Sequence, residues 1–326
     1  MPLVELRAEG LYCPVGGFYI DPCAAVDRAV ITLEHAVAPN ARADAYLTAN
    51  PGKALLRARV GPEATIESAE YGENRSAGAV RLSFHPAGHI LGSAQVRIEH
   101  GGEIWVVSGH YALEPDPTCA SVEPLRCPTF VTEATFALPI FRWPDAAGVR
   151  DAIHAWWRAN QQAGSATLLF AHPVGQAQRL LAMLDPSIGP IYTHESINPV
   201  NAIYVQQNVR LAPAIVAGES GGWRQALILA PPSVHGSAWA RRFGGVSTAL
   251  ASGWMRIRGT RRRRSLDRGF VLSDHADWPA LLRVIEETHA EQILVTGGFR
   301  GPLTRWLQER SREAQSIETP FEEAEP

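Results

Sequence analysis

Apolar and polar positions in the first 135 residues form short β-branched runs separated by glycine or proline, a pattern typical of strands joined by turns. The expected strands are residues 29–32, 65–70, 79–84, 94–99, 103–108 and 129–132. His100-Gly101-Gly102 stands between two of these runs and predicts a hairpin turn. We therefore expect an antiparallel or mixed sheet here.

The pattern changes after Pro144. Residues 146–162 carry Val149, Ile153, Trp156 and Trp157 at helical spacing. Strands are then expected at 166–171, near 191 and at 226–230, and helices at 174–184 and near 200. This alternation predicts a parallel α/β unit, so residues 146–264 are expected to be a smaller domain inserted in the first.

The last part of the chain returns to the first domain. It contains expected strands at 269–273 and 292–296 and expected helices at 279–289 and 302–312. The predicted domains are therefore 1–145 with 265–326, and 146–264.

Composition limits the classes of function. With 326 residues, 46% of them hydrophobic, the chain can bury one large core or two moderate ones. A formal net charge of −3 gives no overall attraction to nucleic acid or membrane, so such contact needs a local patch. Four widely spaced cysteines form no C-x-x-C pair and indicate structural thiols. Since no leader or membrane span is visible, we expect a cytoplasmic protein.

The segment 84–94 is the first candidate for chemistry. Its strand breaks at Pro86 and Gly88, which pushes His89 out of the sheet as a metal ligand or proton carrier. His35 lies where the first strand gives way to a loop or helix, a common place for ligands in layered α/β folds.

Five stretches carry a recognisable set of motifs: residues 84–95, 108–111, 132–136, 272–278 and 294–298. Together they resemble a known family, the bacterial ligase-associated DNA exonucleases. The resemblance covers nearly the whole chain. It implies an α/β fold in which a metallo-β-lactamase αββα sandwich carries an inserted β-CASP α/β domain.

The resemblance also implies where metal ligands belong. The family pattern His-x-His-x-Asp-His falls here on Leu33, His35, Val37 and Ala38. The next ligand matches His89, the bridging aspartate is replaced by His110, and the last histidine by Gly297. We therefore expect the second metal site to be empty. The first is expected to hold one zinc ion through His35, His89 and His110, or none.

Two residues match positions that act in catalysis in that family, and a third lies next to one of them in the sequence. Glu133 corresponds to the first acidic residue of the β-CASP series, and His275 to the histidine that protonates the leaving group. Asp277 is expected to orient the His275 ring. The alternative is that all three are inherited packing residues that no longer act.

An arginine run lies near the end of the predicted inserted domain, and we call it the arginine segment. It contains Arg256, Arg258, Arg261, Arg262, Arg263, Arg264 and Arg268. Such a cluster predicts binding to a nucleic-acid backbone; a solvated face or interdomain salt bridges are the alternatives. A lysine of the family pattern is replaced by Gln176, which removes one expected phosphate contact.

These features favour a catalytically impaired DNA repair exonuclease-like protein, a pseudoenzyme that binds nucleic acid or scaffolds a repair complex. The resemblance implies an ATP-dependent DNA ligase or a helicase as partner. The alternative is an active one-zinc or residual metal-dependent DNA exonuclease, with Glu133 or His275 moving the proton. A phosphate-binding or protein-interaction module without nucleic acid is the third class.

Overall fold

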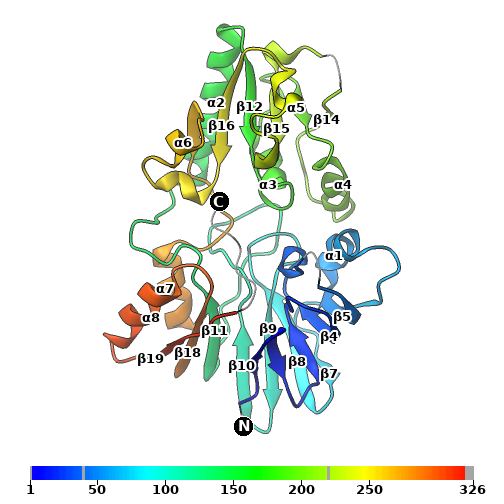
Figure 1. Ribbon diagram of the computed structural model, residues 1–326, viewed down its shortest axis with the longest axis vertical. Helices are drawn as coiled ribbons and strands as arrows, with labels where there is room; N and C mark the ends of the chain where they lie inside the picture. Colours follow the sequence, from blue (N-terminus) through cyan, green and yellow to red (C-terminus); the bar gives the residue numbers. More distant parts are fainter. Residues whose placement is uncertain (1, 39–40, 219–220, 320–326) are drawn as a thin grey trace. The chain divides into compact units, whose positions relative to one another are not determined.

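The computed structural model describes residues 2–38, 41–218 and 221–319 (Figure 1). The chain divides into two compact units, Met1–Phe141 with His275–Pro326, and Arg142–Asp274. From the sequence we expect the second unit to end at residue 264, whereas in the structure it ends ten residues later, at Asp274. The reason is that β17 (Arg268–Phe270) pairs in parallel with β16 (Val246–Ala251) and so belongs to the sheet of the second unit.

The first unit begins with a six-stranded sheet whose strands follow chain order. They are β1 (Glu5–Arg7), β2 (Gly10–Cys13), β3 (Phe18–Ile20), β4 (Val26–Ile31), β5 (Ala43–Ala49) and β6 (Ile66–Ala69). The first three strands are antiparallel, and β3 to β6 run parallel. Helix α1 (Lys53–Val60) connects β5 to β6.

A seven-stranded sheet forms the rest of this unit, in the order β19-β18-β11-β10-β9-β8-β7. Its strands are β7 (Arg75–Ala77), β8 (Val80–Pro86), β9 (Ala94–His100), β10 (Glu103–Val107), β11 (Thr129–Glu133), β18 (Gln292–Thr296) and β19 (Glu313–Ser316). Strands β7 to β10 are antiparallel, and β10, β11, β18 and β19 are parallel neighbours. The predicted mixed sheet and the hairpin between β9 and β10 are confirmed.

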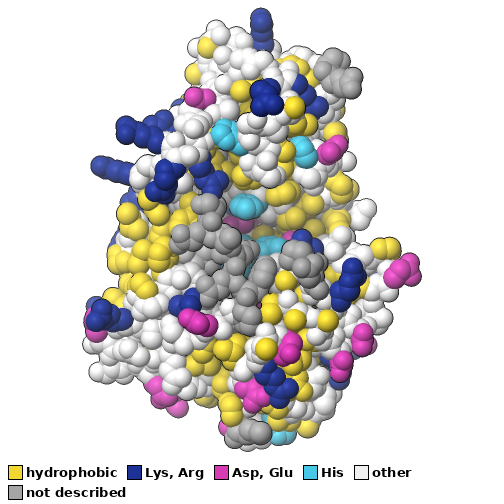
Figure 2. All heavy atoms as spheres, viewed as in Figure 1, with side chains coloured by type: hydrophobic (Ala, Val, Ile, Leu, Met, Phe, Trp, Pro, Cys, Tyr) yellow, Lys and Arg dark blue, Asp and Glu magenta, His cyan; other side chains and the backbone are white. Residues whose placement is uncertain are grey.

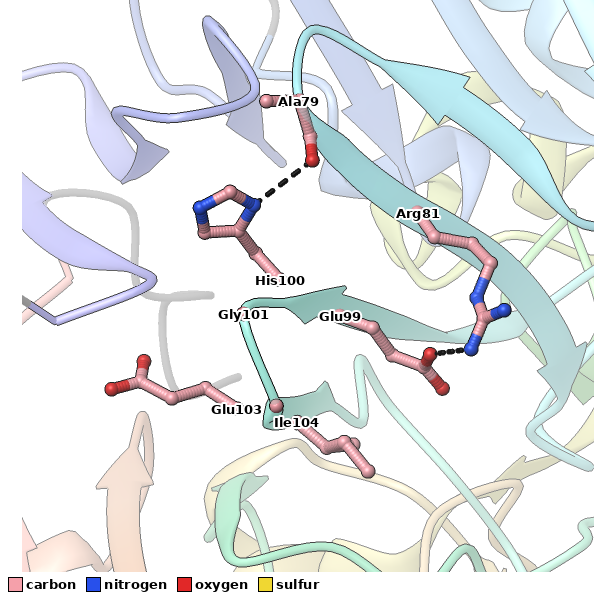
Figure 3. Close-up of a pocket in the computed structure, with 8 residues that line it drawn as sticks. Ala79, Arg81, Glu99, His100, Gly101, Glu103 and Ile104 are labelled. Carbon is pink, nitrogen blue, oxygen red and sulfur yellow. Dashed lines mark hydrogen bonds and ion pairs between the residues drawn. The ribbon is translucent and has the colours of Figure 1, made fainter.

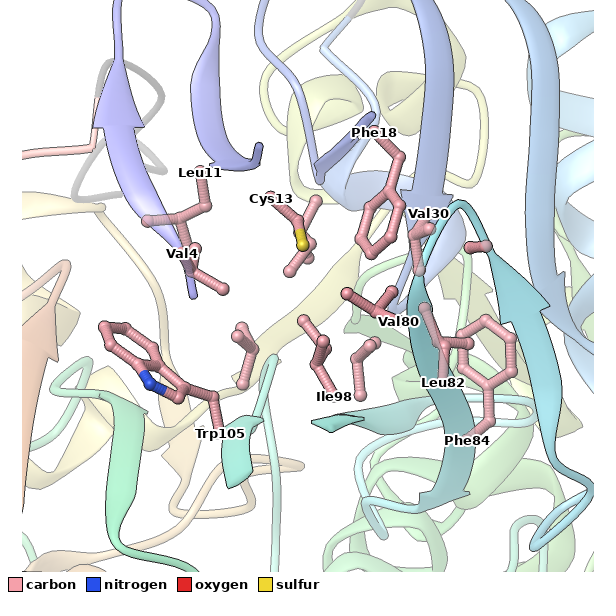
Figure 4. Close-up of a cluster of buried hydrophobic side chains, with 14 of the residues drawn as sticks. Val4, Leu11, Cys13, Phe18, Val30, Val80, Leu82, Phe84, Ile98 and Trp105 are labelled. Carbon is pink, nitrogen blue, oxygen red and sulfur yellow. The ribbon is translucent and has the colours of Figure 1, made fainter. Parts of the chain in front are cut away.

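The two sheets pack face to face across the main core (Figure 4). Phe18 and Val30 of the first sheet meet Leu82, Phe84 and Ile98 of the second. On the outer face of the second sheet lie α7 (Trp278–Glu287) and α8 (Arg300–Gln308), and α1 covers the outer face of the first. The unit therefore has four layers, in agreement with the predicted mixed α/β class.

The second unit contains a six-stranded, wholly parallel sheet, as the alternation predicted. Its order is β14 (Ile215–Val216), β13 (Ile191–Thr193), β15 (Leu227–Ala230), β12 (Ala166–Phe170), β16 and β17. The helices are α2 (Ala146–Gln162), α3 (Gln176–Met183), α4 (Asn198–Gln206), α5 (Ala238–Arg241) and α6 (Thr260–Arg263). Helix α2 has the bounds that its spacing predicted, and the Asp145 carboxylate caps it by accepting from the Gly148 N–H at 3.0 Å.

Both faces of this sheet are covered. Leu169 of β12 packs with residues of α2 and α3, whereas its neighbours Leu168 and Phe170 pack against Ala240 of α5. Burial on both faces explains why β12 is apolar throughout rather than alternating.

Short 3-10 helices occur at Glu34–Ala36 (η1), Asn50–Gly52 (η2), Trp223–Gln225 (η3), Pro232–Val234 (η4) and Gly253–Arg256 (η5). None of the described helices is long and apolar enough to cross a membrane.

Candidate functional site

The turn after β8 holds His89 in one position. Gly88 and Gly92 both adopt left-handed backbone, with φ of +76° and +77°. A Cβ on Gly88 would lie 2.3 Å from the Ala112 carbonyl oxygen, so the chain passes too closely for any side chain there. The Ser93 hydroxyl accepts from the His89 N–H at 3.1 Å, and His89 is buried. The sequence-predicted strand break therefore aims this imidazole inward.

The end of β4 is fastened by Asp21, which the sequence analysis did not single out. Its carboxylate accepts from the Thr32 N–H at 2.8 Å and from the Thr32 hydroxyl at 2.6 Å. Burial raises the pKa of Asp21 to about 6, although the bonds from Thr32 and the nearby His110 and His35 act in the opposite direction. Asp21 thus fixes the point at which the chain enters η1.

His35 lies in η1 beside a buried carboxylate. Its Nδ1 is 3.1 Å from Oε1 of Glu34, and its Nε2 is 3.3 Å from Nε2 of His89. Glu34 is 7% exposed, and its Oε2 has no hydrogen-bond partner within the described part of the chain. Sequence reasoning missed Glu34, and its adjacency to His35 was the one available signal.

Glu133 gathers two further histidines at the end of β11. Its Oε2 is 3.2 Å from Nδ1 of His110 and 2.9 Å from Nδ1 of His275, and it also accepts from the Thr135 hydroxyl. Its Oε1 accepts from the Tyr111 N–H at 3.0 Å. Burial by itself would raise the pKa of Glu133, but the charges and hydrogen bonds of His275 and His110 hold it well below its ordinary value. Glu133 is therefore a buried, ionised carboxylate.

His35, His89, His110 and His275 form one group, which we call the histidine cluster. Ring centroids are 5.2 Å apart for His35 and His89, 6.0 Å for His35 and His110, and 5.4 Å for His89 and His110. His275 lies 4.5 Å from His89 and 4.7 Å from His110. The three histidines singled out as metal ligands thus lie together, and His275 lies with them.

Asp277 is placed at the start of α7. Its side chain accepts from the Ala280 N–H at 3.0 Å and so caps this helix. Nδ1 of His275 lies 2.9 Å from Oε2 of Glu133. An orienting role of Asp277 toward His275 stays a prediction.

The positions at which the resemblance expects further ligands carry apolar residues. Leu33, Val37 and Ala38 are buried, and the last two pack with Ile31 and Leu56 in the core beneath α1. Gly297 has no side chain. These four positions supply no ligand atom, so the side chains there do not fit a second metal ion.

The remaining donor set fits one metal ion. Within the first unit, ligand atoms of His110, Glu133 and His275 all lie within 4.8 Å of one another. Imidazole nitrogen and carboxylate oxygen are ligands that zinc accepts. The site therefore offers a His/Glu group that can hold an ion.

The arginine segment lies on the surface of the second unit, where Figure 2 shows Lys and Arg side chains gathered over the part that carries α6. Arg258, Arg261, Arg262 and Arg263 are exposed, and Arg261 donates to the Asp267 carbonyl oxygen at 2.6 Å. Among the residues that the structure describes, none of these four pairs with a carboxylate. Their charges therefore face water.

Gln176, at the position of the family lysine, is 3% exposed. Its amide donates to the Leu272 carbonyl oxygen at 3.2 Å and accepts from the His172 N–H at 3.1 Å. Arg179, on the same helix, donates to the Ser273 carbonyl oxygen. In this chain α3 therefore fastens the segment that precedes His275.

A surface pocket of about 330 Å³ lies elsewhere, beside the hairpin between β9 and β10 (Figure 3). Arg81 and Glu99 form an ion pair in it, and Nδ1 of His100 is 2.9 Å from the Ala79 carbonyl oxygen. No member of the histidine cluster lines this pocket, so it is separate from the candidate site.

No family model matches the chain. It is 30% identical over 329 residues to a protein of Opitutus terrae named "Probable DNA ligase", an alignment that covers 97% of this chain and 31% of that protein. It is 26% identical over 158 residues to "Endoribonuclease YSH1" of Candida albicans, covering 48% of this chain and 18% of the relative. "Cleavage and polyadenylation specificity factor 73" of Drosophila melanogaster is 29% identical over 122 residues, covering 37% of this chain and 18% of the relative.

The chain thus spans less than a third of the length of each of these relatives. At low identity, the similarities support the relationship to metallo-β-lactamase/β-CASP nucleases that the motifs indicated.

Proposed function

We propose that this chain binds the backbone of nucleic acid as a catalytically impaired member of a DNA repair exonuclease family, and that it acts beside a DNA ligase. The observation that carries the proposal is the pairing of a His/Glu group able to hold one ion, made of His110, Glu133 and His275, with apolar residues where a second ion would need ligands.

The impairment follows from the chemistry of phosphodiester hydrolysis. A two-metal site holds its ions about 4 Å apart so that both the attacking and the leaving oxygen are stabilised. Val37 and Ala38 lie in a hydrophobic core, and Gly297 offers no side chain. This chain would therefore lack the paired clamp even when one ion is bound.

Nucleic acid as the partner is supported by the exposed arginine segment and by the names of the relatives, which include a ligase and endoribonucleases. Guanidinium groups bind phosphate oxygens in pairs, and binding that releases counterions weakens steeply as salt rises. Since the whole chain carries a net charge of −3, this local patch would carry the contact.

The test of binding is a salt titration of affinity for a fluorescent single-stranded oligonucleotide. We expect the change of Arg261, Arg262, Arg263 and Arg264 to Ala to weaken binding at least tenfold and to reduce the slope of log K against log salt by about 0.7 for each lost phosphate contact. The matched control removes four exposed arginines of the first unit, Arg28, Arg283, Arg305 and Arg310, and so changes net charge equally. Equal losses in both variants, or no binding by the unchanged protein, would refute the proposal.

The test of impairment is a nuclease assay with purified protein and an excess of Zn²⁺ or Mn²⁺. We expect no degradation of end-labelled single- or double-stranded DNA above a no-protein control. Degradation that disappears in His89→Ala would show that the unchanged site hydrolyses DNA.

A ligase as partner is supported by the architecture of one relative. The protein named a probable DNA ligase is about three times as long as the region that it shares with this chain. In that relative, a segment similar to this chain is therefore part of a longer polypeptide. We expect this chain to co-purify with a DNA ligase of its own host; retention of none of the host's ligases on the immobilised chain would count against this partner.

A one-zinc hydrolase is the second candidate, and the buried pair of His275 and Glu133 favours it because a carboxylate that orients a histidine is typical of general acids. In this candidate His35, His89 and His110 hold the zinc ion. It predicts DNA turnover that His275→Ala abolishes while the zinc content remains one equivalent. The proposed function predicts no turnover in either protein.

A further inference from the structure

A series of ring contacts in the second unit leads from its core to its surface. The ring of Tyr192 in β13 lies 4.9 Å from that of Trp223 in η3, and Trp223 lies 5.0 Å from Phe243. Phe243 in turn lies 4.8 Å from Trp239 of α5, and Trp239 lies 4.8 Å from His194. Phe243 is buried, whereas Trp239 is partly exposed. The last aromatic rings of this series therefore reach water.

Arg242, the residue after α5, packs its guanidinium group on these rings. Its Cζ lies 4.6 Å from the centre of the Trp239 ring and 5.0 Å from the centre of the Phe243 ring. One guanidinium nitrogen donates to the Ala217 carbonyl oxygen at 2.9 Å. A cation over an aromatic face is attracted by the ring quadrupole, and the hydrogen bond adds a second point of attachment. The guanidinium plane is therefore held in one orientation before any ligand binds, which lowers the entropic cost of binding.

This guanidinium is not neutralised by its neighbours. Arg242 is exposed, and in the described part of the chain no carboxylate forms an ion pair with it. His194 is uncharged at neutral pH, because burial lowers its pKa and the charge of Arg242 acts in the same direction, against that of Glu195. Arg242 therefore offers a planar cation that rests on aromatic rings and still meets water.

The group lies where parallel α/β sheets usually bind ligands. After β12 the chain continues into α3 on one face of the sheet, and after the neighbouring β15 it continues into α5 on the other face. Ligands of such sheets bind beside the carboxyl ends of the strands where the chain changes face in this way. His194 and Ala217 directly follow β13 and β14, and they contact Trp239 and Arg242. The held guanidinium is therefore at the carboxyl ends of the strands.

A guanidinium plane backed by aromatic rings suits an unpaired nucleic-acid base. The bases of single strands stack on aromatic side chains and on arginine planes, and every base has a face that can do so. In a duplex these faces are covered by the neighbouring base pairs. A free phosphate or an acidic peptide would use the charge of Arg242 but not its plane. The arrangement therefore favours a single strand with exposed bases.

We propose that Arg242, with its guanidinium plane held on Trp239 and Phe243, is a stacking site for one unpaired base of a single-stranded nucleic acid. The inference rests on the proposed function and deepens it, because it adds a contact with a base to the contacts with the backbone. A strand that carries bases should therefore bind more tightly than an equally charged strand that lacks them.

The first test compares two fluorescent oligomers of equal length and charge with the unchanged protein. One is a deoxythymidine oligomer, and the other carries abasic sites at every position. We expect the deoxythymidine oligomer to bind at least about fivefold more tightly, which corresponds to the stacking of one base. Equal affinity for the two oligomers would overturn the inference.

The Arg242→Lys variant keeps the charge and removes the plane. We expect its affinity for the deoxythymidine oligomer to fall at least about fivefold, with the affinity for the abasic oligomer and the salt dependence unchanged. Arg241→Lys is the matched control, because Arg241 is the neighbouring exposed arginine and donates to the Gly236 carbonyl oxygen. An equal loss for both oligomers, or no loss for the deoxythymidine oligomer, would show that Arg242 does not stack on a base.

The Trp239→Leu variant supplies a second test, which also decides the question if Arg242→Lys does not fold. Leucine keeps an apolar side chain against Phe243 but removes the aromatic ring that supports the guanidinium plane. We expect weaker binding of the deoxythymidine oligomer and unchanged binding of the abasic one. Unchanged binding of both oligomers by the folded variant would contradict the supporting role of Trp239.

The two oligomers also keep this inference distinguishable from the proposed function. Salt-dependent binding that is equal for both oligomers would leave the proposed function standing and remove this inference. A preference for the deoxythymidine oligomer that Arg242→Lys abolishes, together with unchanged affinity when the arginine segment is altered, would do the reverse. Binding of neither oligomer would refute both.

Discussion

The buried carboxylate of Asp21 makes the stability of this protein depend on pH in a direction that can be calculated. The pKa of Asp21 is raised from 3.8 to about 6 in the folded chain. Between these two values the folded state binds more protons than the unfolded state. The free energy of unfolding therefore falls as pH rises from about 4 to about 6, and the loss is complete above the folded pKa.

The perturbation that isolates this effect is Asp21→Asn. An asparagine can still accept from the Thr32 N–H and can donate to the Thr32 hydroxyl, so both contacts survive. A rise of the Asp21 pKa from 3.8 to about 6 corresponds to about 3 kcal/mol. We therefore expect the free energy of unfolding of the variant, relative to the unchanged protein, to move in its favour by up to about 3 kcal/mol between pH 4 and pH 8.

The assay is urea unfolding of metal-free protein at several pH values, followed by tryptophan fluorescence. Asp27→Asn is the control, because it makes the same change of side chain at an exposed residue of β4. A constant difference between Asp21→Asn and the unchanged protein, or a change in the opposite direction, would refute the reasoning.

Three further predictions concern packing and thiol chemistry. Gly92→Ala should lower the free energy of unfolding in urea by more than about 3 kcal/mol, because its Cβ would lie 2.1 Å from Gly52 Cα at a φ of +77°. Gly101→Ala, which has open space around it and a φ of +59°, should cost only about 1–2 kcal/mol, and similar losses in the two variants would refute the steric argument. Burial raises the pKa of Cys127 to about 12, so its thiol should react with a disulfide reagent at pH 8 at least a hundredfold more slowly in the folded than in the unfolded protein. Mass spectrometry of the labelled peptide measures both rates, and comparable rates would contradict this prediction. Trp157→Ala should lower the free energy of unfolding by about 3–5 kcal/mol, because this side chain is fully buried and also donates to the Gln225 carbonyl oxygen at 3.1 Å. A loss under about 1 kcal/mol in the same assay would contradict its place in the core.

Elements with a strong local signal could be predicted from the sequence. Helix α2 shows its apolar residues at helical spacing, and β18 is a short run with β-branched residues between polar ones. Strands β16 and β19 were not predicted because Val-Ser-Thr-Ala-Leu-Ala and Glu-Ala-Gln-Ser carry little β signal of their own. They are extended because β12 and β18 offer them hydrogen-bonding partners.

Some residues of the candidate site could likewise be predicted from the sequence, and others could not. Pro86 and Gly88 are residues that end a strand, so the sequence alone predicts that His89 lies in a turn. The sequence does not single out Glu34 or Asp21, because their roles depend on burial and on which side chains lie next to them. Glutamate side chains are mostly exposed in folded proteins, whereas Glu34 is buried in η1.

The sequence by itself determined the mixed α/β class, the parallel second unit and the histidines that mark the site, because periodicity, chain breaks and residue type are local properties. Only the tertiary structure decided that His275, distant along the chain, joins His89 and His110, and that one carboxylate, Glu133, holds two of these rings. Such contacts join strands that pair across more than a hundred residues, as β11 and β18 do. Their geometry depends on sheet register and packing, which no local pattern encodes.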